Sequence, residues 1–253
     1  MASHLPETMG FFDLFSKKKD STPSAKPKEV ARLERLVANK FSQNYDRQEA
    51  IDELCRLGTA ESAAALLKRF DWMLDPSITD QEEKENCVKG LVLAGDSALA
   101  PIRNYCKKAE SLNWPLKALR EIAPGERFVE EVLSLLDQFD TEYVRNVEPK
   151  LQLLKELADH PSEEVRVAVE PFIGDMSEPV RFAAVTTVFA MNDPESVPAL
   201  VEQLAAEESL RVKNRIAQGL AEKGWPVSEE QSAACKGALP PGFRLSDGIV
   251  RAG

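Results

Sequence analysis

The chain has 253 residues, of which 43% are hydrophobic and 29% are charged, and its formal net charge is −10. This composition can form a core and does not favour a disordered chain. The chain has no apolar run long enough to cross a bilayer and no secretory signal pattern, and its cysteines form no Cys-x-x-Cys pair. We therefore expect a cytoplasmic protein with reduced thiols.

Residues 1–28 are predicted to form a flexible tail that carries a short aromatic and basic motif. The motif consists of Phe11, Phe12, Leu14, Phe15, Lys17, Lys18 and Lys19, and a linker rich in Ser, Thr, Pro and Lys follows it. Such a motif can bind a partner protein, or it can hold the protein peripherally at an anionic membrane. The alternative is that it covers the apolar end of the first helical hairpin. These interpretations stay open.

Residues 29–238 are predicted to form helical hairpins, because apolar residues recur at helical spacing between short turns. The expected pairs are 46–58 with 61–72, 79–95 with 96–109, 113–123 with 126–139, 147–158 with 162–173, 177–191 with 196–204, and 209–224 with 228–239. Asp46, Thr79, Ser177 and Ser196 are expected N-caps. Since one hairpin cannot bury its apolar stripe alone, the pattern predicts an all-α, right-handed α-solenoid of about six hairpins.

Residues 239–253 are predicted to be a C-terminal capping tail. Its apolar side chains Phe243, Leu245, Ile249 and Val250 are expected to lie over the last helices. The chain has no alternating β-branched run and no Asn-Gly turn, so no strand pair is expected here or elsewhere.

The segment 177–204 resembles a HEAT-like repeat of the short bacterial type that is also found in phycobilisome bilin lyases. The matching features are Val180-Arg181, Ala184, Val188, Asp193-Pro194, Val197-Pro198-Ala199-Leu200 and Leu204. The resemblance implies that Arg166, Arg181 and Arg211 bond to the turn of a neighbouring repeat, for example to Asp193. It says little about activity, because repeat arrays carry many functions.

The search for catalytic or cofactor chemistry is mostly negative. There is no phosphate-binding glycine loop, no Gly-x-Ser-x-Gly, and no His-Glu pair of the kind that di-iron deoxyhypusine hydroxylases use, since Pro161 follows His160. A bilin-lyase-like or other cofactor-handling chaperone is the alternative function that the resemblance implies. We expect no catalytic, cofactor-binding or metal-binding residues, and therefore a protein that is not an enzyme.

Charge is distributed unevenly along the chain. Residues 126–208 contain 19 acidic and 6 basic side chains, whereas residues 209–253 contain 4 acidic and 7 basic ones. Nucleic acid is disfavoured as a ligand because phosphate binding needs a basic track. The second helices of the hairpins are expected to place carboxylates on an acidic concave face that binds a basic segment of another protein. These are Glu130, Glu131, Asp137, Glu163, Glu170, Glu202, Glu207 and Glu208. The alternative is that they only maintain solubility. The sequence thus predicts a HEAT-repeat scaffold or adaptor.

Overall fold

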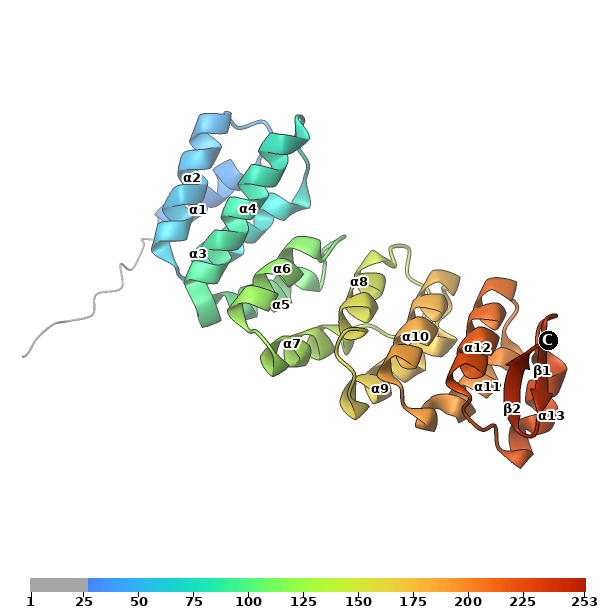
Figure 1. Ribbon diagram of the computed structural model, residues 1–253. Helices are drawn as coiled ribbons and strands as arrows, with labels where there is room; N and C mark the ends of the chain where they lie inside the picture. The colour runs from blue at the N-terminus through green and yellow to red at the C-terminus, as the bar shows by residue number, and fades with distance from the viewer. Residues whose placement is uncertain (1–26) are drawn as a thin grey trace, which may run out of the picture.

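The computed structural model describes residues 27–253, so the aromatic and basic motif of the tail lies outside the described residues. Figure 1 shows an elongated array of short helices that runs from the N-terminal end to the C-terminal end. The helices are α1 (Pro27–Ala38), α2 (Asn44–Leu57), α3 (Ala60–Leu67), η1 (Lys68–Asp71), α4 (Ser77–Ala94), η2 (Gly95–Ala98), α5 (Leu99–Cys106), α6 (Asn113–Ile122), α7 (Glu126–Leu136), α8 (Glu148–Leu157), α9 (Glu163–Val169), η3 (Glu170–Gly174), α10 (Glu178–Met191), η4 (Pro194–Ser196), α11 (Val197–Ala206), α12 (Leu210–Lys223) and α13 (Glu229–Ala238). Among them, none combines the length and the hydropathy that crossing a membrane requires.

The predicted all-α solenoid of helical hairpins is confirmed. The six hairpins are α2–α3, α4–α5, α6–α7, α8–α9, α10–α11 and α12–α13, in the order expected from the sequence. Helix α1 precedes them and packs against α2 and α3. It buries Val30, Leu33 and Val37, which recur at intervals of three and four residues and so lie on one face of the helix.

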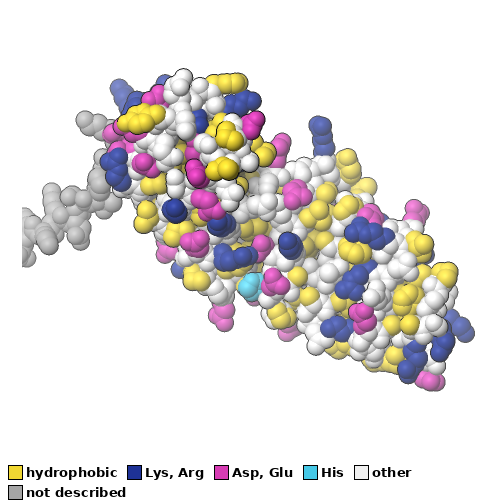
Figure 2. All heavy atoms as spheres, turned by 45° about the horizontal axis from the view of Figure 1, so that its top comes forward, with side chains coloured by type: hydrophobic (Ala, Val, Ile, Leu, Met, Phe, Trp, Pro, Cys, Tyr) yellow, Lys and Arg dark blue, Asp and Glu magenta, His cyan; other side chains and the backbone are white. Residues whose placement is uncertain are grey.

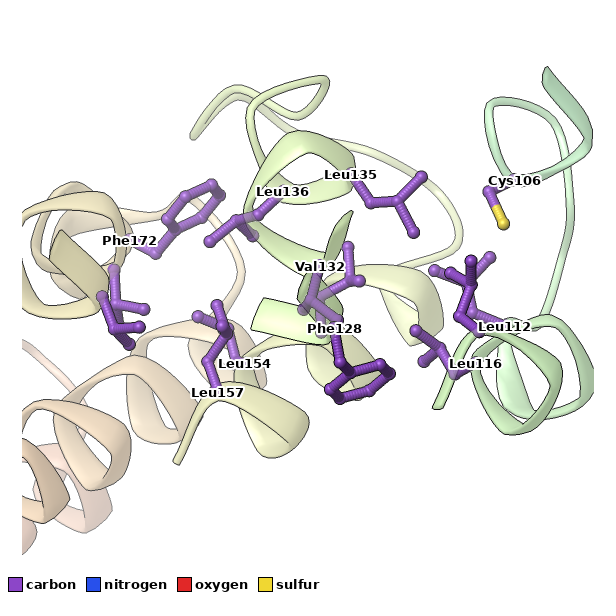
Figure 3. Packing of buried hydrophobic residues seen from close by; sticks show 14 of the residues in the cluster. Cys106, Leu112, Leu116, Phe128, Val132, Leu135, Leu136, Leu154, Leu157 and Phe172 are labelled. Atoms are coloured by element: carbon purple, nitrogen blue, oxygen red, sulfur yellow. The ribbon is translucent and has the colours of Figure 1, made fainter. Parts of the chain in front are cut away.

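Neighbouring hairpins stack through equivalent helices. The first helices contact one another in the series α2, α4 and α6 and again in the series α8, α10 and α12. The series is interrupted between α6 and α8, where direct contacts are sparse and α7 packs against α8 instead. Helix α7 runs at a steep angle to α8 in Figure 1. In Figure 3, Phe128 and Val132 of α7 stand between Leu112 and Leu116 on one side and Leu154 and Leu157 on the other. The apolar core is therefore continuous through this junction.

A close approach of α10 and α12 requires a glycine. A Cβ atom on Gly219 would lie 2.3 Å from the ring of Phe189, which is itself stacked on Trp225 at a centroid distance of 5.6 Å. The absence of a side chain lets the aromatic pair fill the space between these helices and the C-terminal segment.

Several helix starts differ from the expected ones. Helices α2 and α4 begin before Asp46 and Thr79, which therefore lie in the first turn instead of capping it. Ser177 makes no side-chain cap bond, and the Ser196 hydroxyl donates to Glu170 instead. By contrast, Ser162, Ser209 and Ser228 accept from the backbone N–H three residues later, and Thr59 forms a reciprocal capping box with Ser62.

The C-terminal tail contains a β-hairpin that was not expected. Strand β1 (Phe243–Ser246) pairs with β2 (Ile249–Ala252) in antiparallel register. Asp247 and Gly248 form the turn with φ angles of 51° and 73°, which suits a two-residue hairpin turn of the Asp-Gly type. Strand β2 packs against α12 and fully buries Val250, while β1 contacts α13. The hairpin thus covers the last repeat.

The four cysteines are free, and three of them are buried. Burial, together with the charge of Asp52, raises the pKa of Cys55 to about 11, and burial raises the pKa of Cys106 to about 12. Burial also raises the pKa of Cys87 and Cys235. Little thiolate forms at neutral pH, so these groups are weak nucleophiles.

Candidate functional site

A network of five charged side chains is buried in the first two hairpins. Its members are Arg47 on α2, Arg69 on η1, and Asp80, Glu83 and Lys84 on α4, all of them 7% exposed or less. Glu83 accepts from Arg47 at 2.7 Å and from Arg69 at 2.6 Å. Asp80 accepts from Arg69 at 2.7 Å and from Lys84 at 2.8 Å. The spacing of three and four residues on α4 places both carboxylates on the face that meets α2 and η1.

This ion network also holds two loops in place. Arg47 donates to the carbonyl oxygen of Ser42 at 2.8 Å, and Arg69 donates to that of Trp72 at 3.1 Å. The Trp72 ring lies 3.8 Å from the Arg69 guanidinium, a distance typical of a cation–π contact. Burial alone would raise the pKa of Asp80, but hydrogen bonds from Lys84, Arg69 and Leu74 outweigh it and lower that pKa. The network consists of three basic and two acidic side chains.

Beside the ion network lies the aromatic cavity, a hollow of about 1010 Å³ between the loop after η1 and the loop between α5 and α6. Its apolar lining includes Phe70, Trp72, Met73, Tyr105 and Trp114. Phe70 stacks on Trp114 at 6.0 Å and meets the edge of Tyr105 at 6.3 Å. Burial raises the pKa of Tyr105, and Asp71 raises it further, so its phenol stays protonated. The charged residues of the lining are Lys68, Asp71, Asp80, Lys84, Lys108 and Glu110.

Three of the eight carboxylates predicted to form an acidic face are held in ion pairs. Glu131 accepts twice from Arg103 at 2.6 Å, Glu170 pairs with Arg166 at 3.2 Å, and the buried Glu207 accepts twice from Arg181 at 2.8 Å. These three carboxylates offer less free charge to a partner than the sequence suggested. The other five, which are Glu130, Asp137, Glu163, Glu202 and Glu208, are exposed.

The structure gathers a different set of carboxylates around Glu130. A cavity of about 520 Å³ lies between α7 and the turn that joins α8 to α9, and we call it the acidic groove. Its lining includes the carboxylates of Glu126, Glu130, Asp159 and Glu164 together with His160, and no lysine or arginine. Asp137 lies elsewhere, in the lining of another cavity with Phe172. None of Glu126, Asp159 and Glu164 was among the predicted residues. Glu126 and Glu164 lie in the first turns of the second helices α7 and α9, whereas Asp159 lies in the turn between α8 and α9, which the prediction did not consider.

Of the three arginines expected to bond to the turn of a neighbouring repeat, only Arg166 does so. Arg166 pairs with Asp193 in the next hairpin at 2.8 Å, as the resemblance implied. Arg181 pairs with Glu207, which follows its own hairpin, and Arg211 reaches back to Glu178 at 3.1 Å. The pairs of Arg166 and Arg211 thus bind one repeat to the next, and Figure 2 shows further Lys and Arg side chains toward the C-terminal end.

The pair between Arg181 and Glu207 predicts a pH-dependent contribution to stability. Burial alone would raise the pKa of Glu207, but donors from Arg181, Ser209 and Gln203 lower it from 4.5 to about 2. Because the folded-state pKa is the lower one, the carboxylate stabilises the fold above pH 4.5, and this contribution is lost as the pH falls toward 2. We expect Glu207→Gln to cost no more than about 3 kcal/mol at pH 7 and much less at pH 3. Urea denaturation at both pH values measures this, with the exposed Glu208→Gln as control. An equal cost at both pH values would contradict the assignment.

No cluster of His, Cys, Asp or Glu that could hold a metal ion occurs among residues 27–253. A family model for HEAT repeats matches residues 129–221, from α7 through most of α12, and no curated protein matches the chain. The match concerns the repeat in general and does not single out the bilin-lyase type. Its span coincides with the hairpins whose arginines connect neighbouring repeats. Residues 129–221 of the chain are therefore HEAT-like repeats.

Proposed function

We propose that this protein is a non-enzymatic scaffold that binds another protein through the acidic groove, where a basic segment of the partner docks. HEAT repeats commonly serve as protein-interaction scaffolds, and the repeat match supports this general class. The observation that supports the groove as the docking place is its lining of four carboxylates without a basic residue.

The charges around the groove favour a cationic partner. The nearby basic side chains are already engaged, Arg127 with Asp96 at 2.9 Å and Arg120 with Glu156. They leave Glu126, Glu130 and Glu164 exposed and without an arginine partner among the described residues. A hollow lined by one sign of charge raises the local concentration of an oppositely charged segment. Its binding is expected to weaken as salt screens the carboxylates.

Charge reversal at the groove tests this proposal. The probes are a fluorescent 12-residue peptide rich in lysine and arginine and an acidic peptide of the same length. Wild-type protein is expected to bind the basic peptide and not the acidic one, with an affinity that falls as the salt concentration rises. The double variant Glu130→Lys with Glu164→Lys is expected to weaken that binding at least tenfold.

The matched control is Glu202→Lys with Glu208→Lys, which changes the net charge equally at two exposed positions outside the groove. It is expected to weaken binding by less than threefold. Circular dichroism checks that each variant is folded. Equal losses in the two double variants would mean that only net charge matters, and that result would refute the groove as the docking place.

A further inference from the structure

The aromatic cavity is not explained by the scaffold proposal. We propose that it is a docking site for a segment of the same chain, the aromatic run Phe11–Phe15 of the N-terminal tail. Three features of the molecule support this assignment: the apolar lining, the lysines within it and the length of chain that precedes α1.

The lining suits a cluster of aromatic side chains. The stacked rings of Phe70 and Trp114 and the ring of Tyr105 form an apolar surface within a hollow of about 1010 Å³. Met73, also in the lining, is 77% exposed. An exposed methionine beside aromatic rings makes an adaptable apolar contact, and aromatic pairs add to the burial of surface. Covering this apolar surface is expected to stabilise the protein, because it removes apolar area from water.

The tail provides matching chemistry. Phe11, Phe12 and Phe15 supply three aromatic rings within five residues, and Asp13 supplies one carboxylate between them. In the cavity lining, Lys84 is paired with Asp80 at 2.8 Å, whereas the exposed Lys68 and Lys108 form no ion pair among residues 27–253. A carboxylate at the position of Asp13 can approach one of these two ammonium groups while the rings contact the apolar lining.

The tail is also long enough to reach the cavity. Residues 16–26 separate the aromatic run from Pro27, where α1 begins, and an extended chain of this length spans about 36–40 Å. Helix α1 is about 18 Å long by its 12 residues and packs against η1. Since η1 contributes Lys68, Phe70 and Asp71 to the cavity lining, the distance to be crossed is of the order of one helix length plus one helix diameter. A short linker of this kind gives an effective concentration near the millimolar range, which favours docking within one chain.

Photo-cross-linking of the full chain tests the proposal. A photoreactive phenylalanine analogue replaces Phe12, and mass spectrometry maps the products. Cross-links are expected at residues 68–77 and 104–114 within single chains, independent of protein concentration. Met73→Asp is expected to lower their yield at least fivefold. The matched control Ile78→Asp, at a 70% exposed position outside the cavity, is expected to keep the yield within twofold.

A second measurement uses tryptophan fluorescence of the full chain. In a Trp225→Phe background, emission comes from Trp72 and Trp114, both in the cavity lining. Substituting Phe11, Phe12 and Phe15 with serine is expected to increase acrylamide quenching about twofold. The proposal would be overturned by unchanged quenching, or by cross-links that are spread over other surfaces or that join two chains. It would also be overturned if the tail bound added anionic vesicles instead of the cavity. Because no partner is involved, failure here is separate from failure of the acidic groove.

Discussion

Replacing Glu83 with glutamine is expected to destabilise the N-terminal hairpins by about 3–5 kcal/mol. The carboxylate is 1% exposed and bonds to Arg47 and Arg69, which are 2% and 0% exposed. Glutamine keeps the shape but removes the negative charge, so the buried Arg47 loses its carboxylate partner, while Arg69 keeps Asp80. A buried charge that loses its partner costs much more than a surface pair contributes. Urea denaturation measures the loss.

Hydrogen exchange locates the same damage. Because each repeat contacts its neighbours alone, α2 and α4 are expected to lose protection while α10 and α12 keep theirs. The control is Glu85→Gln on the same helix, where the carboxylate pairs with the half-exposed Lys117 and the cost is expected to stay below about 1 kcal/mol. Similar losses in the two variants would contradict the importance assigned to the ion network.

In the C-terminal half of the array, replacing Val188 with aspartate is expected to lower the free energy of unfolding by several kcal/mol. Val188 is fully buried on α10, the helix that contacts both α8 and α12. An ionised carboxylate there would lose its hydration and find no partner in an apolar surrounding. Thermal melting and hydrogen exchange measure the effect, which is expected to extend over α8 to α12 and to spare α2.

Ala190→Asp is the matched control, since it introduces the same side chain two residues away at an exposed position of the same helix. We expect it to cost less than about 1 kcal/mol, most of it from a negative charge near the helix C-terminus. If Val188→Asp melted like the wild type, the burial assigned to this face of α10 would be wrong.

The order of the six hairpins was predictable because the sequence encodes it locally. Apolar spacing in segments such as 177–191 and 209–224, with glycine or asparagine at their ends, is sufficient to place helices and turns. Exact starts were less predictable. Ser177 and Ser162 look alike as capping residues, but the geometry of the preceding turn decides that the Ser162 side chain alone accepts the cap bond.

Features that depend on residues far apart in the chain were missed. Arg69 and Glu83 have the appearance of ordinary surface charges, because their burial is created by the packing of α2 and η1 against α4. Likewise, Glu131 looked free until its partner Arg103, 28 residues earlier, was placed beside it. The Asp247-Gly248 turn was a readable local signal, which a search for Asn-Gly alone overlooked.

The interrupted stacking between α6 and α8 affects how easily the array bends. Elsewhere the first helices of neighbouring hairpins pack side by side, whereas at this junction α7 packs against α8. Polar contacts also join α6 and the loop before it to α8, among them the pair of Arg120 with Glu156 and the bond from the Leu112 N–H to Gln152. Bending stiffness is therefore expected to be lowest there. Under a pulling force, the hairpins before and after this junction are therefore expected to change their mutual angle before any hairpin opens.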